Sequence, residues 1–399
     1  MVLSDSNLFK SIKVGNVTLQ NRLVHVPTTR LRATEDHVPT DSNLEYHDQR
    51  SKNNGGLIIY EATGANENFG FYPNQPMIEN ERQVKSFKKI VDKIHENGSY
   101  ASLQIVHVGR AFNPQLAKKL NLPFVGPSSI YINEENENES KKENIQLKEL
   151  TKDEIKIIIK EFINSTKKAI NEAGFDFVEI HGAHMFLIDQ FLQTVSNQRT
   201  DEYGGSIENR ARFLFEIIDG CIEAVGADHL GVRLSPYTEF NGGLGIKSEI
   251  NPIVLWGYIL SELQKRANSG NELAYISLVE PRLQGDDWEI DEKTSKINFE
   301  WPRYIWKGII IRAGAFLDEK VIDKLEESIN SDNKLLIGVS RPFTSNPDLV
   351  NRLKNGYPLT KYDRSKFYNI MQNDGYITFG SYGEEDDHSK DDVVPKPLA

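Results

Sequence analysis

The chain has 399 residues, a length that allows two or three domains or one large barrel with insertions. Its formal net charge of -11 disfavours a nucleic-acid or anionic-membrane partner. Its 1 cysteine, Cys221, excludes an intrachain disulfide, and no apolar run approaches the roughly 20 residues of a membrane-spanning helix. The first residues lack the charged and apolar regions of a signal peptide, so we expect a cytoplasmic protein.

Eight short apolar runs recur along the chain and are predicted to be strands. They span residues 22–26, 57–60, 100–106, 175–180, 230–234, 274–279, 308–311 and 334–337. Amphipathic segments with helical spacing separate most of them, at residues 81–96, 151–172, 207–225, 252–267, 317–329 and 347–355. Eight alternating units whose strands are apolar on both faces predict an α/β fold, the parallel (β/α)8 TIM barrel. The rival doubly wound sheet would need a glycine-rich first turn, and G-x-G-x-x-G is absent.

Three segments lie outside this repeat. Residues 113–149 are long, and residues 133–144 within them are expected to be a solvated low-complexity loop. Residues 281–299 are expected to form a loop or hairpin insertion over the barrel mouth. Residues 383–399 are acidic and then proline-containing, which predicts a disordered tail. No domain boundary is evident, so residues 1–382 are expected to form a single barrel domain.

Polar residues gather at the predicted carboxyl ends of the strands, where barrels of this kind carry their chemistry. The candidates, in chain order, are Thr28, Thr29, Gln104, His181, His184, Arg233, Arg312, Gly314, Ser340 and Arg341. The rim is cationic and holds two imidazoles, which suits an anionic cofactor and a substrate oxygen. The residues after the last two strands also match the place where such barrels bind phosphate.

Other interpretations remain open for two of these residue types. His181-x-x-His184 could bind zinc, although only two ligands are local and no cysteine cluster or H-E-x-x-H motif accompanies them. Arg233 could instead pair with a carboxylate in the barrel core. We therefore predict no metal site.

The ordered motifs of the chain resemble the Old Yellow Enzyme family of FMN-dependent ene-reductases. The motifs that carry the resemblance lie at residues 7–16, 27–33, 179–184, 197–213, 233–236, 278–282, 305–308 and 345–349. They extend in order over roughly residues 7 to 380. The resemblance implies a barrel that holds FMN in its mouth and takes electrons from NADPH.

The resemblance also assigns roles to single residues. Thr29 would contact a flavin carbonyl, and Gln104 and Arg233 would bind the pyrimidine edge of the ring. His181 and His184 would hold the carbonyl or nitro oxygen of the substrate. The remaining residues implied to bind the cofactor are Pro27, Thr28 and Ala62 along the flavin, and Gly314, Ser340 and Arg341 at the phosphate.

The chain departs from the family pattern at several positions. The family has a proton-donating tyrosine where this chain has Phe186, a residue that cannot donate a proton. Val106 replaces a bulky tryptophan, which should enlarge the pocket, and Ala62 replaces a glycine. Tyr368, at the place of a pocket-lining tyrosine, is an alternative proton source together with solvent.

The sequence therefore predicts an FMN-dependent NADPH oxidoreductase that reduces α,β-unsaturated carbonyl or nitro compounds. Two alternatives remain open, a flavin-assisted isomerase and a flavoprotein that chiefly binds phenolic or steroid-like ligands. Relatives are often dimers, so a homodimer is one oligomeric state to expect.

Overall fold

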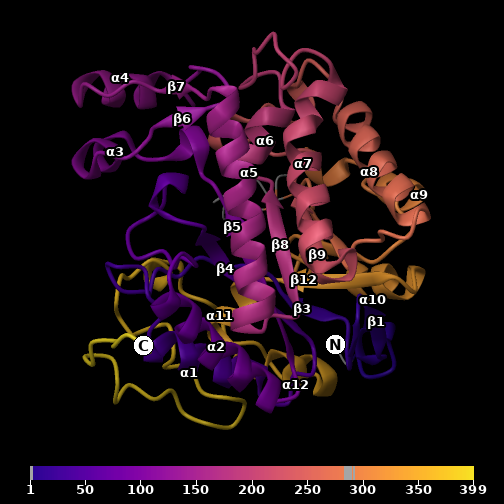
Figure 1. Ribbon diagram of the computed structural model, residues 1–399. Coiled ribbons are helices and arrows are strands. Elements are labelled where there is room, and N and C mark those ends of the chain that lie inside the picture. The colour runs from indigo at the N-terminus through magenta and orange to yellow at the C-terminus, as the bar shows by residue number, and fades with distance from the viewer. Residues whose placement is uncertain (1–2, 283–289, 291–292) are drawn as a thin grey trace.

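The computed structural model describes residues 3–282, 290 and 293–399 (Figure 1). Eight parallel strands form a closed barrel in the order β10-β11-β12-β3-β4-β5-β8-β9. The TIM barrel predicted from the sequence is confirmed. The strands are β3 (Leu23–His25), β4 (Leu57–Gly64), β5 (Tyr100–Val106), β8 (Phe177–Gly182), β9 (Leu230–Leu234), β10 (Tyr275–Val279), β11 (Ile310–Ala313) and β12 (Leu335–Val339).

Helices cover the outside of the barrel and bury their apolar faces against the strands (Figure 1). They include α2 (Glu81–Glu96), α5 (Lys152–Lys167), α7 (Ile207–Val225), α8 (Pro252–Asn268), α10 (Asp323–Ser331) and α12 (Leu349–Asn355). α2 and α7 have the bounds that the apolar periodicity predicts. α5 continues as a π-helical stretch (Lys168–Ala173), and its N-terminus is closed by a capping box between Thr151 and Glu154.

The sequence did not reveal helix α1 (Asp41–Ser51), which lies between β3 and β4. Apart from Tyr46, its buried residues are polar, and they include Asn43, His47 and Arg50. Because periodicity of apolar residues is the main helix signal in a sequence, a helix buried through polar contacts escapes it. A capping box formed by Thr40 and Asn43 begins the helix.

A short hairpin closes the amino-terminal end of the barrel. It pairs β1 (Ile12–Val14) with β2 (Val17–Leu19) around a turn at Gly15, whose φ is +48°. A Cβ atom at Gly15 would lie 2.1 Å from the carbonyl oxygen of Asp228, so glycine is required there. Ile12 and Val14 pack into the same apolar cluster as Phe177.

The excursion between β5 and α5 is more ordered than the sequence predicted. It contains α3 (Pro114–Leu120), α4 (Glu134–Lys142) and a small sheet of β6 (Val125–Gly126) and β7 (Lys148–Glu149). The expectation of a loop at residues 133–144 was wrong, because α4 begins at an Asn133 cap and carries Glu134, Glu135 and Glu137 in its first turn. Acidic residues at the start of a helix complement its dipole.

The final segment of the chain lies against α1. The Lys390 ammonium pairs with Glu45 at 2.7 Å, and the Lys396 carbonyl accepts the Asp41 N–H at 2.8 Å. These contacts differ from the disorder that the composition of residues 383–399 predicts. They are polar and long-range, so neither composition nor periodicity reports them.

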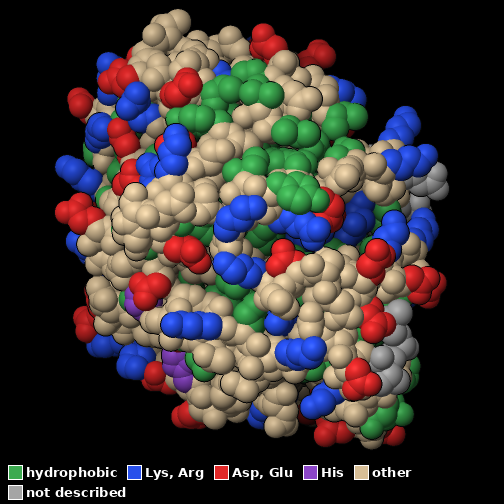
Figure 2. Space-filling view, turned by 90° about the vertical axis from the view of Figure 1, so that its right-hand side faces the viewer, with side chains coloured by type: hydrophobic (Ala, Val, Ile, Leu, Met, Phe, Trp, Pro, Cys, Tyr) green, Lys and Arg blue, Asp and Glu red, His purple; other side chains and the backbone are tan. Residues whose placement is uncertain are grey.

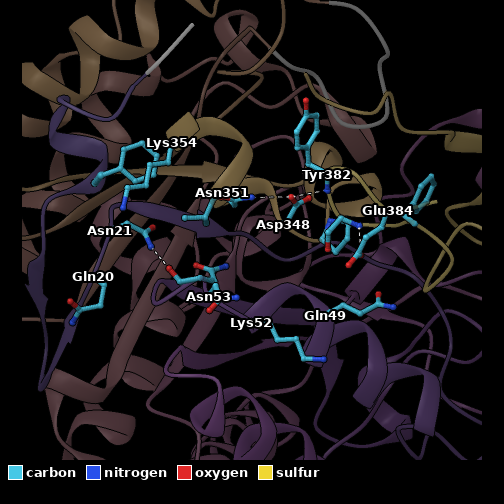
Figure 3. A pocket seen from close by; sticks show the side chains of 16 residues that line it. Gln20, Asn21, Gln49, Lys52, Asn53, Asp348, Asn351, Lys354, Tyr382 and Glu384 are labelled. Carbon is cyan, nitrogen blue, oxygen red and sulfur yellow. Dashed lines mark hydrogen bonds between the residues drawn. The ribbon is translucent and has the colours of Figure 1, made fainter. Parts of the chain in front are cut away.

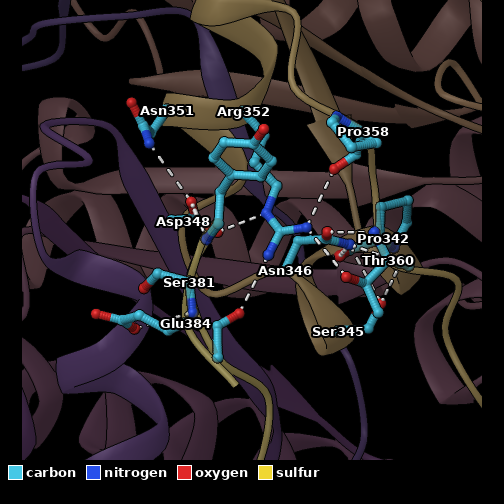
Figure 4. A network of polar contacts seen from close by, with 12 residues as sticks. Pro342, Ser345, Asn346, Asp348, Asn351, Arg352, Pro358, Thr360, Ser381 and Glu384 are labelled. Atoms are coloured by element: carbon cyan, nitrogen blue, oxygen red, sulfur yellow. Dashed lines mark hydrogen bonds and ion pairs between the residues drawn. The ribbon is translucent and has the colours of Figure 1, made fainter. Parts of the chain in front are cut away.

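Arg352 on α12 binds the stretch that precedes this final segment, residues 358–380 (Figure 4). It pairs with Asp348 at 2.7 Å, and its guanidinium also donates to the carbonyl oxygens of Pro358 and Gly380, each at 3.1 Å. The same guanidinium reaches the Thr360 hydroxyl at 3.0 Å. One buried arginine thus holds three separate stretches of the C-terminal region together.

The side of the barrel that carries α8 exposes apolar side chains among charged ones (Figure 2). Ile253 and Val254, in the first turn of α8, are 47% and 56% exposed. Among the described residues, no helix is both long and apolar enough to cross a membrane. The insertion expected at residues 281–299 falls partly on 283–289 and 291–292, which lie outside the described residues.

Candidate active site

Two adjoining cavities lie at the carboxyl ends of the barrel strands. The first has a volume of about 350 Å³, and the second, of about 590 Å³, shares with it His184, Arg233, Ser340 and Arg341. The second cavity also contains Gly314. The first is lined by the other residues that the sequence singled out, namely Pro27, Thr28, Thr29, Ala62, Gln104, Val106, His181, Phe186 and Tyr368.

A strained turn after β8 presents the two histidines. His181 is in the strand, whereas His184 and Met185 follow it with positive φ angles of 59° and 55°. Left-handed backbone in two successive non-glycine residues is uncommon, and surrounding bonds must hold it. The Ser235 hydroxyl accepts the His184 N–H at 2.7 Å, and the Asp189 carboxylate accepts the Met185 N–H at 2.9 Å.

Both imidazoles are neutral in the folded protein. Burial lowers the pKa of His184 to about 3 and that of His181 well below its usual value, and neighbouring Arg233 lowers both further. The Ala183 N–H donates to Nδ1 of His181 at 3.3 Å. Since Nδ1 is the acceptor, Nε2 of His181 carries the proton and serves as a donor.

The wall beside the histidines is largely apolar. Phe186 is 8% exposed and packs in one cluster with Val106 and Val108. The His184 ring also lies perpendicular to that of Phe240, at 6.3 Å between centroids. The hydroxyl groups that line this cavity belong to Thr28, Thr29, Tyr72, Ser340 and Tyr368.

The barrel floor beneath this cavity holds a buried polar cluster. Gln104 donates its amide to the Glu179 carboxylate at 2.6 Å. Nε of Arg233 is buried and has no hydrogen-bond partner among the described protein atoms. A buried guanidinium N–H without a partner is costly, so a ligand acceptor is expected at this point.

In the second cavity, the backbone at Gly314 lies so close to Glu280 that only glycine fits there. A Cβ atom at Gly314 would lie 2.4 Å from Cβ of Glu280. The Thr28 and Ser340 hydroxyls share a hydrogen bond of 2.7 Å, which joins the segments that follow β3 and β12. Arg341 begins the short helix α11 (Arg341–Ser345) at the same cavity.

Two buried arginines connect the end of β3 to the C-terminal segment. Arg30 donates to the carbonyl oxygens of Phe367 at 3.2 Å and Gly375 at 2.7 Å. Arg32 donates to those of Lys366 at 2.9 Å and Phe367, and both guanidiniums stack over the Tyr376 ring. We call this pair the arginine clasp. It fixes the stretch that places Phe367 and Tyr368 in the first cavity.

Sequence reasoning missed several cavity residues and misplaced one. It gave no signal for Tyr72, Phe240, Arg364 or Phe367, which lie in loops or three-residue 3-10 helices, too short to show periodicity. Arg312, expected at the rim, lines neither cavity, because Glu280 at 2.5 Å and Glu300 at 2.6 Å pair with it. Among the described residues, the histidine pair belongs to no group of three metal-ligating side chains.

A cavity of about 820 Å³ lies elsewhere, between the start of β3, the end of α1 and α12 (Figure 3). Its lining is rich in amides and includes Asn21, Asn53 and Asn351. These residues are at the amino-terminal side of the strands, away from the imidazoles and the unpartnered guanidinium. We therefore take the two adjoining cavities as the candidate active site.

Comparisons with known proteins show the family of the chain. A family model described as the NADH:flavin oxidoreductase / NADH oxidase family matches residues 7–360. A crystal structure of Old Yellow Enzyme from Pichia sp. AKU4542 is 50% identical, with a TM-score of 0.94 and 100% of both chains covered. The chain belongs to the Old Yellow Enzyme family.

Relatives of this chain carry names that fit the family. A "Probable NADPH dehydrogenase" of Candida albicans is 46% identical over 401 residues, with 100% of this chain and 95% of the relative covered. "Enoate reductase 1" of Kluyveromyces lactis is 40% identical over 389 residues, with 96% of each covered. The protein is thus an oxidoreductase with FMN as cofactor and NADPH as reductant.

The residues present fit FMN. The unpartnered Nε of Arg233 offers a donor at the junction of the two cavities. Gly314 leaves room in the second cavity, and Arg341, which lines both cavities, supplies positive charge. A ligand that carries both a polar ring and a phosphate matches these residues.

Proposed function

We propose that this Old Yellow Enzyme reduces α,β-unsaturated carbonyl or nitro compounds, and that the proton comes from a group other than residue 186. FMN, once reduced by NADPH, supplies the hydride. The chain's own residues bind the substrate, orient it and control the proton. Gln104, Arg233 and Thr29 are proposed to hold the flavin ring, and Gly314, Ser340 and Arg341 the phosphate.

The observation that carries this proposal is the pair of neutral imidazoles in the first cavity. The His181 and His184 rings lie 5.6 Å apart at 78°, in the same cavity as Gln104 and Arg233. Neutral N–H donors polarise a carbonyl or nitro oxygen without carrying a charge that the substrate must balance. Such donors favour charge that develops on the oxygen in the transition state.

The proposed reaction differs in its proton source from the reaction that the family resemblance implies. Phe186 offers no hydroxyl, while Tyr72 and Tyr368 line the same cavity and are 39% and 47% exposed. A positioned general acid contributes about 10²- to 10⁴-fold. We propose Tyr368 as the replacement, with solvent as the competing source.

The test separates the two half-reactions under anaerobic conditions. The FMN-loaded protein is reduced with one equivalent of NADPH and mixed with cyclohexenone, and flavin absorbance is followed. Rapid return of the oxidised spectrum with saturated product supports the reductase. Tyr368→Phe should then slow reoxidation, whereas Tyr72→Phe should not. Reduction by NADPH without reoxidation by the enone would overturn the proposal.

A second candidate is an isomerase, and the apolar setting of Phe186 favours it. If protonation fails, the hydride that reached the substrate can return, and the double bond moves or changes geometry without net reduction. This function predicts isomerised product with no net consumption of NADPH beyond the first equivalent. Product analysis by chromatography distinguishes it from both reduction and simple ligand binding.

A further inference from the structure

Glu179 is a buried carboxyl group that has no role in the proposed reaction. It lies on β8 two residues before His181 and is 0% exposed. In the strand register it stands opposite Gln104 of β5 and Gly231 of β9, which places its side chain inside the barrel below the histidine pair. A carboxyl group is almost never fully buried unless a partner balances it.

The partners of Glu179 are the two residues proposed to bind the pyrimidine edge of the flavin. Gln104 donates to its Oε1 at 2.6 Å, and the Arg233 guanidinium acts on it electrostatically. The other titratable group that faces it is Tyr275 of β10, whose hydroxyl shares a hydrogen bond of 3.0 Å with Ser102. Glu179 therefore interacts with Gln104 and Arg233 on the side away from the proposed flavin position.

We propose that Glu179 is a positioning residue that sets the reduction potential of FMN through Gln104 and Arg233, and that it takes up a proton when the flavin is reduced. This inference rests on the proposed flavin contacts of Gln104 and Arg233. Glu179 itself lies behind these two residues and acts through them.

Charge balance explains why the proton should move. NADPH gives up a hydride and becomes NADP⁺, so the neutral isoalloxazine ring of FMN would gain two electrons and one proton and acquire one negative charge. Arg233 then has two anions to balance, the reduced ring and an ionised Glu179. If Glu179 takes a proton from solvent, Arg233 again has only one anion to balance. The sum of charges around Arg233 is then unchanged.

The pKa of Glu179 allows the carboxyl group to gain or lose a proton near neutral pH. Burial raises its pKa to about 7, against the lowering effects of Arg233, Gln104 and Tyr275. Below this pKa the carboxyl is neutral whether the flavin is oxidised or reduced. Above it, the carboxylate opposes reduction, and the opposition should grow with pH.

The experiment compares midpoint potentials of the holoenzyme and of Glu179→Gln across pH. The amide keeps an acceptor for Gln104 but cannot ionise. We expect no difference at about pH 6, and at about pH 8.5 an equilibrium for reduction about tenfold more favourable in the variant. For a two-electron couple this is about 30 mV.

Two further variants guard against a general loss of structure. Tyr275→Phe removes a group that favours the ionised carboxyl, so the pH at which the curves diverge should move upward. Asp189→Asn alters another fully buried carboxyl whose pKa burial also raises to about 7, but which bonds to Met185 and Gln193 instead. Because Asp189 bonds to the turn that carries the histidines and not to Gln104 or Arg233, this variant should produce no pH-dependent gap in potential, whatever it does to substrate turnover.

The outcomes separate the two proposals. A wild-type protein that fails to bind FMN or to be reduced by NADPH would overturn both. A reducible wild type with the same potential as Glu179→Gln at every pH would overturn only the role of Glu179. A constant offset, or an equal pH-dependent gap in Asp189→Asn, would assign the effect to general charge or packing and would also reject it. Redox-difference infrared spectra should show a protonated carboxyl gained on reduction in wild type and absent in Glu179→Gln.

Discussion

The ring of Phe186 lies edge-on to the ring of His181, with their centroids 5.0 Å apart and an interplanar angle of 80°. An aromatic ring without a hydroxyl thus stands beside an imidazole that is proposed to hold the substrate oxygen. The same contact keeps His181 in place through an edge-to-face interaction. Position 186 therefore combines a packing role with the loss of an acid.

Restoring a hydroxyl at this position should speed the second half-reaction. Phe186→Tyr is expected to raise the rate of flavin reoxidation by cyclohexenone about 10²-fold, since a positioned acid contributes about 10²- to 10⁴-fold. Stopped-flow absorbance measures this rate. Phe186→Leu, which has no hydroxyl, is the control and should not increase it. Equal rates in both variants would show that protonation is not limited by residue 186.

Closing the space at Gly314 should weaken cofactor binding. In Gly314→Ala the new methyl group meets Glu280 at 2.4 Å, so the backbone must shift where the phosphate is proposed to bind. We expect the Kd for FMN to rise about tenfold or more, which is about 1.4 kcal/mol or more. Flavin fluorescence on release measures it. Gly257→Ala is the matched control, because its methyl group meets Ile305 at an ordinary 3.5 Å; a similar loss there would point to general destabilisation.

Loosening the arginine clasp should affect the substrate more than the cofactor. Arg32→Lys keeps the charge but cannot reach the carbonyl oxygens of Lys366, Phe367 and Gln372 together. We expect KM for the enone to rise by about tenfold while the Kd for FMN changes little. Arg212→Lys, where an exposed arginine donates to the Glu202 carbonyl at 2.8 Å, serves as the control. Equal changes in KM and in FMN binding would contradict this separation.

Acidification should destabilise the fold through its buried histidines. Burial lowers the pKa of His47 to about 4 and that of His107 to about 3. The unfolded chain takes up protons as pH falls below about 6.5 and the folded chain does not, so stability is lost from there toward the lowered pKa values. Glu179 and Asp189, with pKa values of about 7, act in the opposite direction, since the folded state holds their protons longer.

Burial raises the pKa values of Glu61 and Glu79 as well, but the histidines still outnumber the acids, because His25, His37, His181 and His184 also have lowered pKa values. Tm measured by calorimetry should therefore fall between about pH 6.5 and pH 4. His47→Gln keeps a donor for the Asn43 carbonyl and removes a contribution on the order of 3 kcal/mol at the acid end. An unchanged slope in this variant would contradict the assignment.

The sequence was most informative where local pattern and chemistry coincide. Each strand of the barrel is a continuous apolar run, and the carboxyl ends of parallel strands meet at one edge. The sequence pattern alone could therefore place His181, Gln104 and Arg233 together. The motif resemblance added their proposed roles. Arg312 shows the limit, since its position on β11 was correct but its ion pairs with Glu280 and Glu300 turn it away from the cavity.

The parts that the sequence did not reveal depend on contacts between distant, non-periodic residues. The arginine clasp joins positions more than three hundred residues apart, and its acceptors are backbone carbonyls that any residue provides. Helix α1 is buried through polar side chains, and α4 is stabilised by its cap and charge distribution rather than by an apolar face. Gln104 was chosen for the flavin, yet its 2.6 Å bond to Glu179 depends on the register between β5 and β8, which no local pattern reports.

The arginine clasp also bears on how substrate range can diverge within such an enzyme. Phe367 and Tyr368 line the first cavity but lie in a stretch outside the strands of the barrel. Because the clasp holds that stretch by its backbone, side chains within it can be exchanged without disturbing the attachment. Mutation can thus retune which molecules are accepted while the electron-transfer apparatus of the barrel is left intact.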